Sequence, residues 1–272
     1  MLSAGSNPHV GPLLRDWRKR RRLSQLELAL DAGISARHLS FVETGRSAPS
    51  PDMVLLLAEH LNVPFRQRNQ LLLAAGYAPV FPERSLQDPE MAAVREAVDL
   101  ILSGHEPNPA VVVDRCWNLI AANAPMAALG AWVDPDLLRP PVNVMRVGLH
   151  PRGLARWTVN RGEVRAHFLG RLEHQVAVTG DAALTQLLNE VAGYPGAADE
   201  RDPAAEALAG QILTPLMRLR GPDGVELSFF ATVATFGTAV EVTASELSIE
   251  LAFPADGATA RLLGELSRLP PG

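Results

Sequence analysis

The segment SQLELALDAGISARHLSFVETGR, residues 24–46, constrains the fold of this chain more than any other stretch. Ser24 and Glu27, three residues apart, form a capping box, and the apolar spacing that follows predicts a helix. Its apolar contacts are expected from Leu26, Leu28, Ala29 and Leu30. Gly33 permits the left-handed backbone of a sharp turn, and Ala29 is small enough for a second helix to cross closely over it. The pattern therefore predicts two helices joined by a tight turn.

The second helix is expected to begin after Ser35, a good N-cap residue. Helical spacing turns Ile34, Leu39 and Val42 inward. The residues left facing outward or sideways are Ala36, Arg37, His38, Ser40 and Phe41. A helical hairpin inside a larger bundle would have the same apolar spacing. The glycine turn, the small Ala29, the two caps and a basic flank favour a helix that reads DNA.

Charge is divided unevenly along the chain. Residues 1–82 hold ten basic and six acidic side chains, whereas the remaining residues hold fifteen basic and twenty-four acidic ones. The net charge of the whole chain is −5. A basic first third on an acidic body is typical of a DNA-binding head attached to another domain. The basic run Arg18–Arg22 is either a solvated helix end or a phosphate contact, and its proximity to the turn favours the phosphate contact.

Residues Val10 to Tyr77 as a whole resemble the five-helix domain of the phage-repressor or XRE family, with the outer helices expected at 10–21, 50–61 and 65–75. The resemblance implies that Gln25 holds a phosphate and that the start of the second motif helix enters the major groove. The full set expected to contact DNA is Gln25, Ser35, Ala36, Arg37, His38, Ser40, Phe41 and Arg46. The resemblance also implies a structural pair between Arg18 and Glu43.

This sequence departs from the best-known phage members at Ala36 and Phe41, where those proteins carry amide side chains. An adenine contact of the kind that Asn or Gln makes is therefore not expected from these two positions.

Prolines at positions 79, 82 and 89 mark a linker after the first domain. The predicted domains are a helix-turn-helix domain over 1–78, a linker over 79–90 and a second domain over 91–272. The second domain is expected to begin with a helix over 91–103.

The second domain alternates between strand and helix patterns. Strands are expected at 110–114 and 117–121, a mainly helical region at 142–192, strands at 212–220, 225–236 and 239–252, and a final helix at 258–269. A hairpin, then helices, then a three-strand meander is the order in a PAS-like domain, whose sheet covers one side of an apolar chamber. The predicted fold is thus an all-α five-helix lambda-repressor-like domain followed by an α+β PAS-like domain.

The fragments RNQLLLAAGYAP, PAVVVDRCWNLIAAN and FFATVATFGTAVEVTASELSIELAFPAD resemble the MmyB-like regulators, which are XRE proteins with a PAS-like ligand-binding domain. The resemblance implies a transcription regulator whose second domain binds a small apolar effector, fatty acids being the suggested class. Large apolar residues that either line the chamber or form ordinary core are Trp117, Met126, Phe168, Phe229, Phe230 and Phe236. Asn123 is expected either to orient a polar group of the ligand or to cap the helix that follows it.

Catalytic and metal motifs are missing from the sequence. It has no GxxxxGK[ST], GxGxxG, GxSxG or HExxH, and its one lysine, Lys19, leaves no Ser–Lys pair for self-cleavage in the second domain. We therefore expect no enzyme activity, no metal and no cofactor. His167 and His174 share a helical face but lack ligand partners, which favours surface positions.

The single cysteine, Cys116, cannot form an internal disulfide and is read as a buried small side chain rather than a thiol sensor. No apolar run of about 18 residues exists, so no membrane segment and a cytoplasmic location are expected.

Two functions remain open from the sequence. The first is a ligand-responsive transcription regulator that binds double-stranded DNA as a homodimer, because one recognition helix reads few base pairs. The second is a DNA-binding protein whose C-terminal domain is a protein-interaction module, such as an antitoxin or a sigma-factor adaptor.

Overall fold

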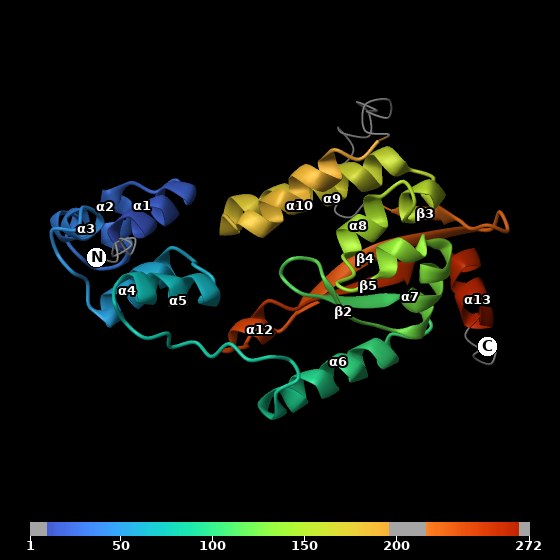
Figure 1. Ribbon diagram of the computed structural model, residues 1–272, viewed down its shortest axis with the longest axis horizontal. Coiled ribbons are helices and arrows are strands. Elements are labelled where there is room, and N and C mark those ends of the chain that lie inside the picture. The colour runs from blue at the N-terminus through green and yellow to red at the C-terminus, as the bar shows by residue number, and fades with distance from the viewer. Residues whose placement is uncertain (1–9, 196–215, 267–272) are drawn as a thin grey trace, which may run out of the picture. The chain divides into compact units, whose positions relative to one another are not determined.

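The computed structural model describes residues 10–195 and 216–266 (Figure 1). The chain divides into two compact units, which are described separately. The first comprises Met1–Arg84 together with the short segments Ala177–Thr179 and Thr238–Ser245, and the second comprises the rest.

The first unit contains the five helices expected from the sequence. They are α1 (Val10–Arg20), α2 (Gln25–Asp31), α3 (Ala36–Glu43), α4 (Pro51–His60) and α5 (Phe65–Ala74). One apolar core, built around Leu14, Leu28, Leu39 and Leu57, joins them. The helical fold of this unit is confirmed.

Local interactions fix the turn between α2 and α3. Ser24 Oγ accepts from the Glu27 backbone N–H at 3.2 Å, and a Glu27 carboxylate oxygen accepts from the Ser24 N–H at 2.7 Å. Gly33 has a φ of +65°, and Ala29 is 1% exposed beneath the crossing helix. The predicted capping box, glycine turn and close crossing are all present.

The apolar face of α2 differs from the prediction. Leu28 and Ala29 enter the core, whereas Leu26 is 60% and Leu30 70% exposed. Because α2 packs against α3 and α4 on one side only, two residues spaced four apart fall together on its open side.

The connection between the last two strands also differs from the prediction of a strand over 239–252. Residues Val242–Ser245 form the short helix α12, and the strand begins only at Ser248. The Glu241 carboxylate accepts from the Ala244 and Arg84 backbone N–H groups, each at 2.7 Å, while the Val242 N–H donates to Pro82 O at 2.8 Å. Partners in the linker thus satisfy this backbone instead of a neighbouring strand.

The second unit is built on a five-stranded antiparallel sheet in the order β2-β1-β5-β4-β3. Its strands are β1 (Ala110–Val113), β2 (Leu119–Ala122), β3 (Met217–Arg220), β4 (Glu226–Thr235) and β5 (Ser248–Pro254). The hairpin, the intervening helices and the three-strand meander follow the expected order, and the α+β class is confirmed.

The sheet has a different helical cover on each face (Figure 1). One face packs on α6 (Ala92–Gly104) through Val112 and Ile249. The other carries Val111 and Val113 beneath several helices. These include α7 (Ala124–Leu129), α8 (Val144–Leu149), α9 (Arg161–Thr179) and α10 (Ala182–Ala192). Alternate residues of β1 therefore serve opposite layers.

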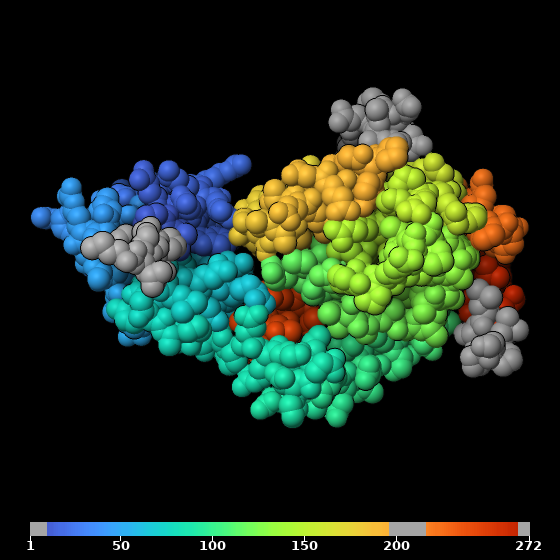
Figure 2. Space-filling model, viewed as in Figure 1, coloured from blue at the N-terminus to red at the C-terminus, as the bar shows by residue number. Residues whose placement is uncertain are grey.

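Shorter elements complete the second unit. The helix α13 (Gly257–Leu266) packs on β4 and β5. Short 3-10 helices are η1 (Pro89–Met91), η2 (Gly130–Trp132), η3 (Pro135–Leu138) and η4 (Leu154–Trp157). Figure 2 shows the side chains of the green-to-yellow helices of the second unit, α7 to α9, gathered on the face of that unit turned toward the viewer. Among the described residues, no helix is both long enough and apolar enough to cross a membrane.

Candidate DNA-contacting helix and effector cavity

A buried ion pair fixes the end of α3. Arg18 on α1 donates from Nε and Nη2 to the two carboxylate oxygens of Glu43, at 2.7 and 2.8 Å. Both residues are buried, and Gln25 Nε2 donates to the same carboxylate at 2.8 Å. Burial opposes ionisation of Glu43, but the hydrogen bonds from Arg18 and Gln25 outweigh it and hold its pKa below the ordinary value. The expected Arg18–Glu43 pair is present.

Gln25 lies at the first turn of α2, half-buried. One amide hydrogen serves Glu43, and a primary amide carries a second one. Its contact with a DNA phosphate stays a prediction.

The open face of α3 carries a cluster of Arg37, Phe41 and Arg46. The guanidinium carbons of Arg37 and Arg46 lie 5.4 and 5.9 Å from the centre of the Phe41 ring. Both arginines are exposed, and neither forms a salt bridge with any carboxylate in the described part of the chain. A half-buried ring that positions two uncompensated cations is suited to an anionic partner. The sequence had indicated these three residues individually, but not their contact.

The other residues expected to contact DNA surround this cluster. Ser35 is exposed, and its Oγ accepts from the His38 N–H at 3.1 Å, which leaves its own hydrogen free to donate. Ala36, His38 and Ser40 are half-buried, and Ala36 packs against the core. Their contacts with DNA stay predictions.

A cavity of about 410 Å³ lies in the second unit, between the sheet and the helices that cover it. Met126, Phe168 and Phe229 lie on its wall, and most of the other lining residues are also apolar. Its volume falls within the range of about 300–1,000 Å³ typical of small-molecule pockets.

The remaining residues expected at the ligand lie outside the lining. Trp117 is 2% exposed, and its indole N–H donates to Gln175 Oε1 at 2.7 Å. Asn123 Oδ1 accepts from the Met126 N–H at 3.2 Å. Of the two roles expected for Asn123, the structure therefore shows the N-cap of α7.

Phe230 and Phe236 are separated from the cavity by the sheet itself. The Phe230 ring stacks on Phe253 with centroids 5.3 Å apart, and Phe236 packs in the cluster around α6. Because side chains alternate along a strand, Phe229 faces the cavity and its neighbour Phe230 faces away. The structure therefore does not bring these two predicted residues to the site.

Three polar residues on the cavity wall were not expected from the sequence. Arg171 donates from its two terminal nitrogens to the Glu250 carboxylate at 2.9 and 2.8 Å, and its guanidinium carbon lies 4.6 Å from the centre of the Trp117 ring. His167, expected at the surface, is half-buried one helical turn before Arg171 and lines the cavity. Burial, reinforced by the Arg171 charge and opposed by Glu250, lowers the pKa of His167.

A signal for Glu250 was present in the sequence. In the strand SIELAF, the carboxylate alternates with Ile249 and Leu251, which places it on the face of Ser248 and Ala252. A charged group on the inner face of a strand paired on both sides requires a buried partner, and Arg171 supplies it.

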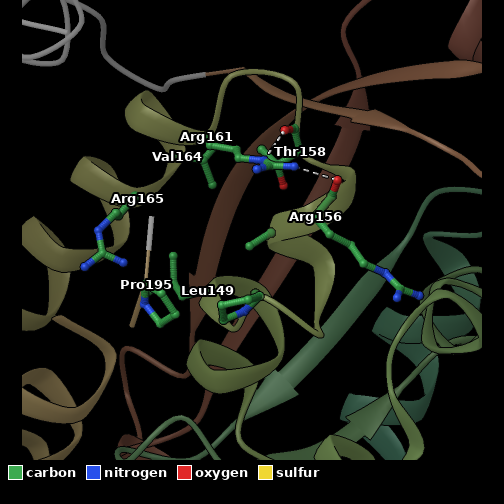
Figure 3. A pocket seen from close by; sticks show the side chains of 10 residues that line it. Leu149, Arg156, Thr158, Arg161, Val164, Arg165 and Pro195 are labelled. Atoms are coloured by element: carbon green, nitrogen blue, oxygen red, sulfur yellow. Dashed lines mark hydrogen bonds between the residues drawn. The ribbon is translucent and has the colours of Figure 1, made fainter. Parts of the chain in front are cut away.

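A second, smaller cavity of about 110 Å³ lies near Arg156, Arg161 and Arg165 (Figure 3). The dashed bonds of Arg161 run to the backbone oxygens of Thr158 and Arg156, at 3.3 and 2.9 Å. Arg165 likewise donates to the Ala192 carbonyl at 2.8 Å. Arg161 thus ties the segment before α9 to that helix, and Arg165 ties α9 to the end of α10, so both side chains have structural roles.

Among the described residues, no group of three histidine, cysteine or acidic side chains could hold a metal ion. Cys116 is free and half-buried, and burial raises the pKa of its thiol.

Comparison with known proteins gives matches over both units. The family described as the MmyB-like transcription regulator ligand binding domain matches residues 94–266, and a helix-turn-helix family matches residues 14–67. An uncharacterized HTH-type transcriptional regulator of Bacillus subtilis (strain 168), RghRB, is 39% identical over 74 residues, which are 27% of this chain and 51% of that protein. The chain thus spans about half the length of this curated relative.

Two solved structures also match. The PAS domain of an HTR-like protein from Haloarcula marismortui aligns with a TM-score of 0.25 and 12% identity, covering 63% of this chain and 99% of that one. An RNA-binding Light-Oxygen-Voltage receptor aligns with a TM-score of 0.27 and 15% identity, covering 98% of this chain and 65% of that one.

Proposed function

The chain belongs to the MmyB-like transcription regulator family, and from this premise we propose that it is a sequence-specific regulator that binds double-stranded DNA through α3. In this proposal it acts as a homodimer, and a small apolar effector of the fatty-acid type, held in the cavity of the second unit, controls it. No enzymatic step is part of the proposal.

The cluster of Arg37, Phe41 and Arg46 carries the DNA-binding proposal. Arg37 lies in the first turn of α3, where recognition helices contact base edges, and a guanidinium matches the O6 and N7 acceptors of guanine. The ion pair of Arg18 and Glu43 holds the helix that presents it.

Selection of a binding site from a random duplex library tests this proposal. On the selected site, Arg37→Ala should weaken binding by about 1–3 kcal/mol and relax preference at one base position. Gln25→Ala should instead weaken binding to all sequences alike, because its expected partner is a phosphate. Arg139→Ala, at an exposed arginine of the second unit, is the matched control and should change nothing. Unchanged sequence preference in Arg37→Ala would mean that α3 is not the reading helix.

The effector proposal depends on the cavity of about 410 Å³ and its apolar wall. A bound effector should raise the free energy of unfolding by roughly 2.7 kcal/mol at a hundredfold excess over its dissociation constant. Regulation further requires that the effector bind the DNA-competent and DNA-incompetent states with different affinities.

Two neighbouring positions of β5 provide a matched test of the effector. Ala252 lines the cavity, whereas Leu251 packs toward α6 on the opposite face. Ala252→Phe should fill the cavity and abolish the thermal shift by medium-chain fatty acids together with any change in operator affinity. Leu251→Phe should leave both unchanged. If no lipid shifts the unfolding temperature of the wild-type protein, the effector proposal fails.

A further inference from the structure

The polar corner of the cavity is assembled before any ligand enters. Arg171 grips Glu250 with two hydrogen bonds and lies over Trp117, whose indole N–H is itself held by Gln175. Ser248 Oγ donates to the Glu250 carboxylate at 3.3 Å. The side chains of Arg171 and Glu250 are 25% and 12% exposed, so bulk water screens this pair only in part.

This corner contains every titratable group of the cavity wall. His167 and Arg171 come from α9 and Glu250 from β5, whereas the wall residues from β1 to β4, α7 and α8 carry no ionisable side chain. Arg171 and Glu250 cancel in charge. His167 is neutral near pH 7 because burial and the Arg171 cation both lower its pKa. The corner therefore has no net charge before a ligand binds.

A ligand oxygen still finds hydrogen-bond donors there. A guanidinium has five N–H groups, and Glu250 occupies two of those on Arg171. An ionised carboxylate placed on the remaining donors would share one cation with Glu250 inside an apolar cavity. Two carboxylates that share one site cannot both remain ionised at low cost. The complex should therefore take up a proton when the acid binds.

We propose that His167, Arg171 and Glu250 form the head-group site of the effector and that this site accepts effectors only with zero added charge. This inference rests on the proposed effector function of the cavity. An acid is bound together with one proton, which its carboxyl group and His167 share. An alcohol of the same chain length is bound without proton uptake.

Calorimetric titration of the full-length protein with dodecanoic acid and with dodecan-1-ol tests the proposal. In buffers of different ionisation enthalpy, the acid should take up one proton per molecule bound and the alcohol none. The dissociation constant of the acid should rise with pH above about 6.5, the ordinary histidine value, by up to about tenfold per pH unit, whereas that of the alcohol should stay constant.

The Glu250→Gln variant isolates the cause. Without the competing carboxylate, Arg171 should pair directly with an ionised acid, so that proton uptake and the pH dependence of acid binding both disappear. Glu226→Gln is the matched control, because Glu226 forms an arginine pair with Arg218 outside the cavity lining. This control should behave as the wild-type protein.

The outcomes separate the two proposals. If both probes bind and the wild-type protein takes up no proton with the acid, the head-group inference is wrong while the effector cavity stands. If neither probe binds, the effector function is wrong and the head-group inference falls with it. The measurement on the wild-type protein decides the question even where Glu250→Gln does not fold.

Discussion

At the scale of single residues, Glu43 connects three helices through one carboxylate. It accepts hydrogen bonds from Arg18 on α1 and Gln25 on α2, while it belongs to the last turn of α3. Because those bonds favour the ionised form, the folded protein holds its pKa below the value of an unfolded chain. Its contribution to stability is therefore present above the unfolded pKa and is lost as the pH falls through the folded one.

Glu43→Gln should accordingly make the free energy of unfolding of the first unit depend less steeply on pH in the acid range. In the wild-type protein, the free energy of unfolding should begin to fall as the pH drops below about 4.3, the ordinary glutamate value. The variant should be less stable at neutral pH, by up to the roughly 3–5 kcal/mol expected when a buried pair loses one partner. Denaturant unfolding at several pH values measures both effects. Glu59→Gln, at an exposed position of α4, provides the control, and an equal acid limb in both variants would contradict the assignment.

At the scale of elements, the five helices α1 to α5 could be predicted almost completely from the sequence. Their starts carry local signals, such as the capping box at Ser24 and the cap at Ser35, which do not depend on distant residues. The exposed Leu26 and Leu30 were misread because the uncovered side of α2 depends on where α3 and α4 pack. Local pattern gives the helix, whereas tertiary packing decides which face is buried.

The cavity site was less predictable for the same reason. Phe229 and Phe230 are equally apolar, and only the register of β4 within the sheet decides which one faces the cavity. Arg171 and Glu250 lie 79 residues apart, so their pairing leaves no trace in a local window. The strand expected over 239–252 begins only at Ser248, because Glu241 and Val242 find backbone partners in the distant linker.

Gly33→Ala tests the turn between α2 and α3. Gly33 has a φ of +65° and open space around it, so the cost of a methyl group there is backbone strain of about 1–2 kcal/mol rather than a clash. Gly170→Ala is the matched substitution, because Gly170 lies inside α9 without a positive φ and with equal space. That change should stabilise by about 0.5–1 kcal/mol. Thermal unfolding of the two variants should move in opposite directions, and a shift of the same sign would refute the strain argument.

At the scale of the whole molecule, a homodimer would present two copies of α3 to one face of the duplex. Its operator should then be an inverted repeat whose half-site centres lie about 10–10.5 base pairs apart, or a multiple of this spacing. Footprinting on the selected site measures the spacing directly, and protection of a single half-site by a monomer would exclude the dimer. Affinity should also fall steeply between about 50 and 200 mM salt, because arginines replace counterions on the phosphates.

The segment Thr238–Ser245 has a consequence for anyone who would recombine these units. It follows β4 and precedes β5 in the sequence, but it belongs to the first unit. There it forms hydrogen bonds with Pro82 and Arg84. The first unit is therefore built from separate segments of the sequence. A chimera with a single crossover point cannot exchange the two units between relatives. A chimera that takes the first unit from one parent and the second unit from another must also take residues 238–245 from the parent that supplies the first unit. A sequence comparison that treats the two halves as independent modules would miss this dependence.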